Sequence, residues 1–275
     1  TDHHDSVLWA LVVIGLVSFL LARHRLSTAL LIAPLATVVL LGIHYNERRL
    51  AWLQLVGGLG LVLLLTPPGR LRRRLSRWAV IAAPLVLVYV AVGCGRSGAV
   101  FAPVRQISSM FDTQTDDSNI YRDLENAGVI VTLQRTRALG TGFGHAFEEV
   151  SDRYSGGMAS GWDEYRFTPH NSVLGLASAA GAVGFPLVWA FLPVGAFFAA
   201  RARAFATQPL EQALASAAFA YPFVYGVQAF GDMGLQSFKA NVLLACCLAT
   251  AARLSVLTGG WTSSRQRRVT APSTY

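Results

Sequence analysis

Long apolar segments, separated by short polar loops, constrain this chain more than any other feature. They lie at residues 7–22, 27–43, 50–65, 78–95, 171–200, 211–230 and 237–257. A helix needs roughly 20 apolar residues to cross a bilayer core of ~30 Å. Charged residues make up only 14% of the chain, whereas soluble domains hold about 25%. We therefore predict an all-α, polytopic membrane protein with about seven transmembrane helices, and we expect Pro186 and Pro193 to kink the fifth.

The arginines predict which loops face the cytoplasm. The short loop 66–77 holds five of them, and short loops rich in arginine stay on the cytoplasmic side. When the helices alternate across the membrane, Arg23 and Arg25, Arg201 and Arg203, and the tail 258–275 fall on that side as well. This pattern accounts for the net charge of +8 as a topology signal, so we expect no nucleic-acid partner.

The alternation divides the chain into four parts. Residues 1–95 form four membrane helices, 96–169 an extracytoplasmic loop, 170–257 three more helices, and 258–275 a basic tail. The loop holds ten of the fifteen acidic residues, and a helix is predicted at 118–138. Because the first residue then lies outside without a signal peptide, we expect an odd number of helices upstream in a longer chain.

Arg48 and Arg49 are the exception to the arginine pattern. This topology places them in a short outer loop, which is unfavourable for insertion. One interpretation is that they act in a functional site. The other is that Glu47 offsets part of their charge and the pair anchors the helix among lipid headgroups. Topology alone leaves both open.

The stretch TPHN, residues 168–171, stands at the outer start of the fifth apolar segment. We expect Thr168 to cap that helix and Pro169 to occupy its first position, which puts His170 in the first turn. The positive end of a helix disfavours imidazolium, so His170 would stay neutral, as a general base must. The alternative is an interfacial histidine that only hydrogen-bonds to a loop or a headgroup.

Glycines punctuate two further stretches. GTGFG at 140–144 departs from the GxGxxG spacing of dinucleotide sites, and we interpret it as a turn that closes the loop helix. Its functional alternative is close approach by a substrate or another segment. Gly181 and Gly184 predict a small-residue face for helix packing. The three cysteines show no metal-ligand or disulfide spacing, and we expect neither metal nor cofactor.

Three motifs in order resemble the O-antigen ligase and polymerase superfamily of bacterial membrane proteins. They are NERRLAWLQL, SNIYRDLENAGVIVTLQRTRALGTGFG and PHNSVLGLASAAGAVG, and together they cover roughly residues 40–200. The resemblance implies about a dozen membrane helices, of which this chain would supply the C-terminal part. It also implies a site in the cytoplasmic (inner) membrane that faces the periplasm.

The resemblance implies metal-independent transfer of a glycan from undecaprenyl pyrophosphate to a hydroxyl of lipid A-core or another glycan. His170 would act as the base, and Arg122 with Arg49 would hold the pyrophosphate. Arg48 is an alternative to Arg49. Asn171 would position His170, and Gly142 and Gly144 would lie against substrate.

Three rival functions stay open at the level of sequence. A polymerase of O-antigen or exopolysaccharide units differs from a ligase only in its acceptor. A transporter of lipid-linked glycans should carry ionisable residues or broken helices near the membrane midplane, whereas nearly every charge here lies at a helix edge or in the loop. A membrane scaffold would make the Arg–Arg–His set coincidental.

Overall fold

The computed structural model describes residues 5–23, 25–46, 48–96, 98–101, 104, 117–136, 138–150 and 167–261, which form helices and no strand. The helices are α1 (Asp5–Arg23), α2 (Leu26–Tyr45), α3 (Arg49–Leu65), α4 (Arg70–Gly93), α6 (Asp117–Thr136), α8 (Ser172–Trp189), α9 (Phe191–Phe205), α10 (Pro209–Gly231) and α11 (Phe238–Leu257). Two short 3-10 turns, η1 (Ala99–Phe101) and η3 (Gly234–Gln236), join them. The all-α prediction is confirmed.

Within the described residues, six helical segments are long and apolar enough to cross a membrane. They are α1, α2, Arg72–Gly93 of α4, the continuous stretch of α8 and α9, α10 and α11. The seventh expected segment is α3, which is apolar but has 17 residues. At 1.5 Å per residue that length lies at the lower end of the spanning range. The prediction of a polytopic membrane protein is confirmed.

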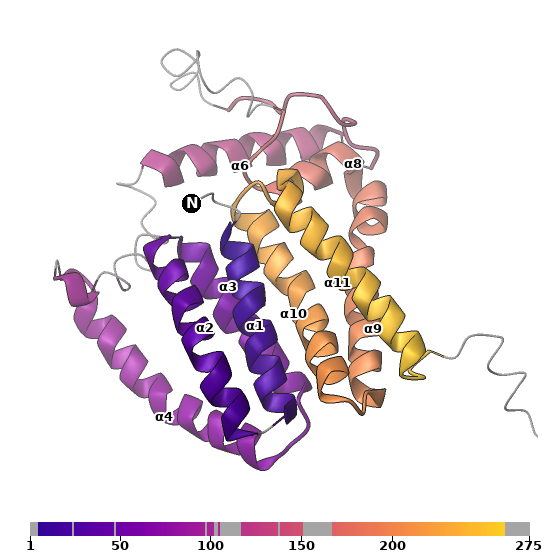
Figure 1. The fold of residues 1–275 in the computed structure, drawn as a ribbon. Helices are drawn as coiled ribbons and strands as arrows, with labels where there is room; N and C mark the ends of the chain where they lie inside the picture. The colour runs from indigo at the N-terminus through magenta and orange to yellow at the C-terminus, as the bar shows by residue number, and fades with distance from the viewer. Residues whose placement is uncertain are drawn as a thin grey trace, which may run out of the picture.

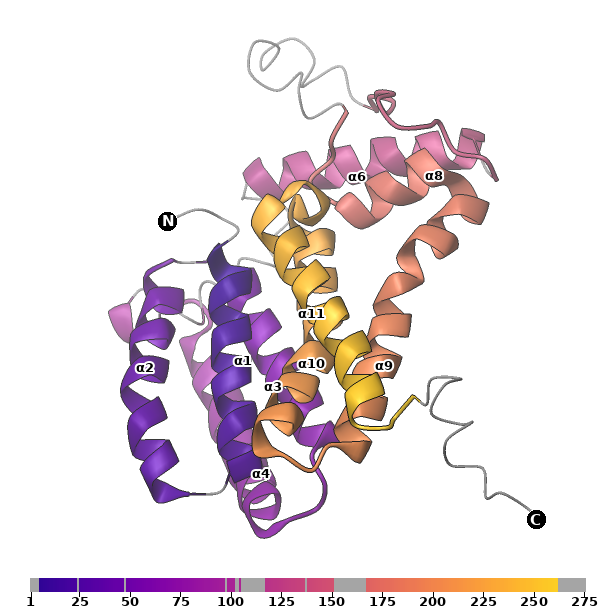
Figure 2. The same cartoon turned by 45° about the vertical axis from the view of Figure 1, so that its right-hand side comes forward.

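Helix α10 lies at the centre of the bundle and packs against α1, α3, α9 and α11 (Figures 1 and 2). Alanines supply much of its buried surface, and small side chains let membrane helices approach closely. Gln54 Nε2 of α3 donates to Gln228 Oε1 of α10 at 2.8 Å, in the buried interior. Helix α4 contrasts with this core, because its residues 76–88 are all exposed.

A second layer covers one end of the bundle. Helix α6 lies across that end, beside the first half of α8 (Figure 2). An ion pair between Lys239 Nζ and Asp5 Oδ1, 2.7 Å apart, joins the starts of α11 and α1 at this end. The ends of α1 and α9 and the start of α4, which carry arginine clusters, lie at the opposite end (Figure 1). Here α6, residues 138–150 and the first half of α8 are called the outer layer.

The fifth apolar segment is interrupted between Pro186 and Pro193, where α8 ends and α9 begins. It also bends sharply at Gly181, with φ 67° and ψ −179°. Only glycine adopts this backbone region readily. The bend exposes the carbonyls of Ser178 and Ala179, which accept the N–H groups of Thr141 and Gly142 at 3.0 and 2.9 Å. The expectation that Gly181 packs another membrane helix is therefore wrong, because its partner is the backbone of the GTGFG turn.

Candidate functional site

Helix α8 begins one turn later than its sequence suggests. The side chain of Asn171, not of Thr168, caps it by accepting the Leu174 N–H at 3.1 Å. Asparagine is among the best N-cap residues, and Ser172 then becomes the first helical residue. His170 precedes the cap and so lies outside the first turn of α8, contrary to the prediction from sequence. A side-chain contact holds His170 instead.

The contact is with Glu125 of α6, a carboxylate that is only 4% exposed. Glu125 Oε2 lies 2.8 Å from His170 Nδ1, and Oε1 accepts the backbone N–H of His170. A carboxylate that accepts from Nδ1–H orients the ring and makes Nε2 the acceptor nitrogen, which is the form a general base needs. Sequence analysis missed Glu125, although it follows Arg122 by three residues and so shares its helix face.

Arg122 ties α6 to the bundle. Its Nη1 donates to the carbonyl oxygen of Gly231 at 3.0 Å. That carbonyl belongs to the last residue of α10, where the negative end of a helix favours a cation. This bond uses one of the five N–H donors that a guanidinium carries in a fixed fork.

These residues line one cavity of about 220 Å³, here called the Arg122 cavity. It lies where α6, the start of α8 and the end of α10 meet. Its walls are Asn119, Arg122, Asp123, Glu125, Asn126, His170, Asn171, Phe230 and Gly231. Three of the residues expected from sequence, Arg122, His170 and Asn171, are thus brought together from segments almost 50 positions apart.

Arg48 and Arg49 are not among the residues that line this cavity. Arg48 is the N-cap of α3 and Arg49 its first helical residue. The next residue, Leu50, packs against Gly231, since a Cβ added to Gly231 would stand 2.7 Å from Leu50 Cδ1. The arginine pair therefore begins α3 beside a wall residue of the Arg122 cavity. Glu47, invoked as its neutralising partner, lies outside the described residues.

Gly142 and Gly144 line a different cavity, of about 270 Å³, here called the Phe143 cavity. Both glycines have φ of 82°, in the left-handed region that favours glycine. A Cβ on the neighbouring Gly140 would overlap the backbone of Ala179 and Gly181. GTGFG is thus a turn that docks onto the bend of α8, and the close approach foreseen for it is made by another segment of the chain.

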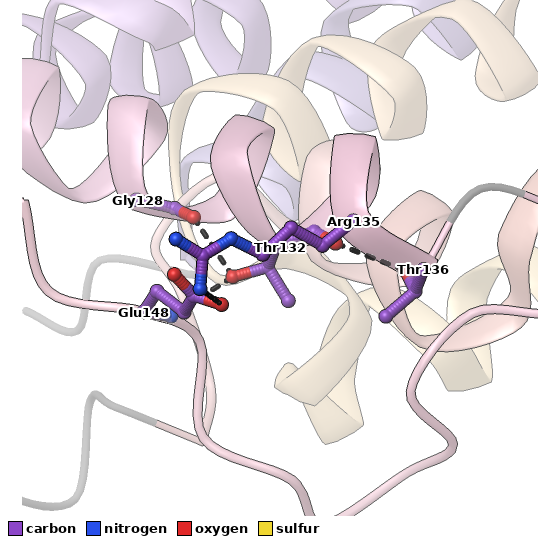
Figure 3. Close-up of polar contacts among 5 residues, drawn as sticks. All are labelled: Gly128, Thr132, Arg135, Thr136 and Glu148. Carbon is purple, nitrogen blue, oxygen red and sulfur yellow. Dashed lines mark hydrogen bonds and ion pairs between the residues drawn. The ribbon is translucent and has the colours of Figure 1, made fainter.

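The segment after this turn lies along α6 (Figure 3). Thr132 Oγ1 donates to the Gly128 carbonyl at 2.8 Å and accepts the Glu148 N–H at 2.9 Å. Arg135 Nη1 pairs with Glu148 Oε1 at 2.6 Å, and the Arg135 side chain is exposed. Arg135 is therefore in an ion pair, and neither it nor Glu148 lines either cavity. Three other loop arginines, Arg137, Arg153 and Arg166, lie outside the described residues.

Among the described residues, no cluster of three or more His, Cys, Asp or Glu side chains is arranged to hold a metal ion. The polar groups of the Arg122 cavity are guanidinium, carboxylate, imidazole and amide. Such a set can bind an anion and move a proton.

Fold and site together define a polytopic helical membrane protein whose candidate site lies at one end of its helices, beneath a covering layer. The model of the O-antigen ligase family matches residues 35–189, which is more than half of the 275 residues, and the chain belongs to this family. The matched range contains Arg49, Arg122 and His170. Searches of curated proteins and of solved structures found no match.

Membership places the chain among the O-antigen ligases and polymerases, a superfamily of membrane enzymes of the glycosyltransferase kind. Their substrates are, in general, lipid-linked glycans and polysaccharide or lipid acceptors. The apolar helices and the family together identify a membrane protein.

Proposed function

We propose that the Arg122 cavity is the catalytic site of a ligase-type glycosyltransferase. The reaction moves a glycan from undecaprenyl pyrophosphate to a hydroxyl of lipid A-core or another glycan. One observation carries the proposal: an arginine and a carboxylate-oriented histidine line a single cavity at the end of the membrane helices. A lipid-linked donor needs a site at the membrane edge, and a cavity at the end of the apolar helices fits that need.

In the proposed reaction, an acceptor oxygen attacks the anomeric carbon of the donor as the bond from that carbon to the pyrophosphate oxygen breaks. His170 Nε2 takes the proton of the acceptor hydroxyl. Glu125 stabilises the imidazolium that forms and holds the ring in place, as a buried carboxylate does beside a catalytic histidine. Asn171 acts indirectly: its side chain caps α8, which fixes the backbone directly after His170.

The leaving group is undecaprenyl pyrophosphate, on which negative charge builds as the bond breaks. A guanidinium fork matches phosphate oxygens and can stabilise this charge in place of a metal ion. Arg122 is the arginine in the cavity wall. Arg49, or Arg48 in its place, would contact the pyrophosphate from the start of α3 beside that wall.

The arginine distribution supports a periplasmic site in the bacterial inner membrane. The arginine clusters of α1, α4 and α9 lie at the end of the bundle opposite the outer layer. Short arginine-rich loops face the cytoplasm, so the Arg122 cavity would open on the other side. Undecaprenyl-linked glycans would then be used after they have crossed the membrane.

A transporter of lipid-linked glycans is less well supported. Its sites should lie near the midplane, at broken helices or ionisable residues. The break at Gly181 instead lies in the outer layer. The buried Arg203, in the last turn of α9, donates to Ser216 of α10. A polymerase would use the same cavity, and only its acceptor would differ.

The test is glycan transfer by the full-length protein from an undecaprenyl-pyrophosphate donor, with a chelator present. A positioned general base contributes about 10²- to 10⁴-fold, so His170→Ala should lose activity by that factor. His44→Ala is the matched control, because His44 lies in the last turn of α2 at the same end of the bundle and lines neither cavity. Unchanged transfer in His170→Ala would overturn the role of His170, and a strict divalent-metal requirement would overturn the arginine mechanism.

A further inference from the structure

The Phe143 cavity lies on the other side of the segment that carries His170. Thr168, Pro169 and Ser172 line the Phe143 cavity, whereas His170 and Asn171 line the Arg122 cavity. Helix α6 is divided in the same way: five residues of its first half, from Asn119 on, line the Arg122 cavity, whereas Val129 and Thr132 line the Phe143 cavity. The two cavities therefore stand side by side with the His170 segment as their shared wall.

The two cavities differ in chemistry. None of the residues that line the Phe143 cavity, all in the described part of the chain, is Asp, Glu, Lys or Arg. Its walls combine aromatic rings with hydroxyl, amide and imidazole groups, among them Phe143, Phe147, Phe167, Thr141, His145 and Gln236. Such a lining does not suit a pyrophosphate. It suits an uncharged ring with apolar faces and a polar edge, which is the chemistry of a sugar.

The exposed aromatic rings support a binding role. Phe143 is 78% exposed and Phe167 52% exposed. Phe143 belongs to the outer layer and Phe167 to the segment that leads into α8, so neither lies in a membrane helix. Exposed aromatic groups beside a cavity indicate a contact surface. The backbone next to Phe143 is fixed in place, because the N–H groups of Thr141 and Gly142 hydrogen-bond to carbonyls at the bend of α8.

We propose that the Phe143 cavity binds a sugar ring of the acceptor glycan, with Phe143 and Phe167 against its apolar faces. Thr141, His145 and Gln236 hydrogen-bond to its hydroxyls. This inference rests on the proposed function, since that function places the donor pyrophosphate at Arg122. An acceptor glycan held there lies beside the segment that carries His170, while the donor sugar approaches from the Arg122 side.

Two measurements on the full-length protein in lipid nanodiscs test this assignment. The first is saturation-transfer NMR, without donor, on the oligosaccharide released by mild acid from the host's own acceptor glycan. The second is the KM for acceptor and for donor during transfer. For Phe143→Ala/Phe167→Ala we expect saccharide binding to weaken by at least about tenfold, because two aromatic contacts are lost. The KM for acceptor should rise in parallel, with kcat and the KM for donor unchanged.

Two control variants sharpen the result. Leu139→Ala removes an exposed apolar side chain from the same turn, outside the cavity lining, and should bind saccharide like the wild type. Phe143→Trp/Phe167→Trp keeps two aromatic faces and should retain binding, which separates stacking from mere folding of the turn.

Three outcomes discriminate between the claims. Unchanged saccharide binding and unchanged acceptor KM in the double alanine variant would overturn the inference while leaving the proposed function intact. A rise in the KM for donor instead of acceptor would also overturn it. If the wild type shows no glycan transfer but binds the oligosaccharide, and the double alanine variant does not, the sugar site stands and the proposed function fails.

Discussion

The bundle and the outer layer are held together by different forces. Around α10 the bundle is packed with apolar and small side chains over most of its interior, and a few side-chain hydrogen bonds, such as the buried Gln54–Gln228 pair, join its helices. In the outer layer, Arg122, Glu125 and Thr132 of α6 each contact a distant segment through hydrogen bonds. Packing of this kind tolerates small changes, whereas a layer held by a few directed bonds should fail when one of them is removed.

Gly181→Ala is expected to have the largest effect on the outer layer. At φ 67° and ψ −179° an alanine is strained by about 1–3 kcal/mol. Its Cβ would also overlap the Ala138 carbonyl oxygen and the Gly140 nitrogen. The GTGFG turn should leave α8, and transfer should fall about 10²-fold, since a shift of ~1 Å at a site can cost that much.

Limited proteolysis of residues 138–150 and circular dichroism provide the measurements. We expect faster cleavage of this segment with unchanged helical content. Gly184→Ala is the matched control, because Gly184 has no positive φ and its nearest neighbour would be Ala180 Cβ at 3.1 Å. Equal protection of the turn in both variants would show that the bend is not what holds the outer layer.

A second prediction concerns the Glu125–His170 contact. Glu125→Gln offers an N–H donor where a second acceptor is needed, so one of its two bonds to His170 is lost or the ring changes tautomer. We expect kcat to fall by roughly 10- to 100-fold, as for other groups that orient a functional histidine. The KM for both substrates should stay unchanged.

Glu148→Gln is the control for this variant, because Glu148 is an outer-layer carboxylate that pairs with Arg135 and lines neither cavity. A shifted pH profile of kcat in Glu125→Gln, absent in Glu148→Gln, separates positioning of His170 from general structure. Wild-type kcat in Glu125→Gln would contradict the orienting role.

The bundle should respond least to loss of a polar contact. Gln54→Leu and Gln228→Leu together replace the buried amide pair by apolar groups. Hydrogen bonds between membrane helices are worth on average ~0.6 kcal/mol and at most ~1.7 kcal/mol. A double-mutant cycle of unfolding in mixed micelles should therefore give a small coupling, with unchanged transfer. A coupling above about 3 kcal/mol would show that the bundle also depends on directed bonds, against the contrast drawn above.

Hydropathy predicted the bundle well because apolar length is a local property of the chain. The segments 211–230 and 237–257 correspond to Pro209–Gly231 and Phe238–Leu257 within two residues. The bend at Gly181 was not predicted, since a glycine among small residues has the same sequence signature whether it packs a helix or turns the chain. What decides is Gly140, about 40 positions earlier, and no local pattern reveals that partner.

The residues of the candidate site also fall into those that local sequence patterns predict and those that only the tertiary fold reveals. Arg122 and His170 could be chosen from motifs and topology, and both line one cavity. Glu125 could not, because ten acidic residues of the loop compete for the role and only the tertiary fold brings one of them to His170. The cap at Asn171 was missed because Thr168 and Asn171 are both good caps, and the sequence does not reveal that Glu125 holds His170 just ahead of the helix.

The most direct test of the central claim is the dissociation constant of undecaprenyl pyrophosphate for the full-length protein, measured with chelator present. Arg122→Ala should bind at least about tenfold more weakly than the wild type, because a charge-assisted hydrogen bond contributes about 1.5–3 kcal/mol. Arg135→Ala, on the same helix but paired with Glu148, should bind within about twofold of the wild type. Equal affinities for the wild type and Arg122→Ala would contradict the assignment of the Arg122 cavity as the pyrophosphate site.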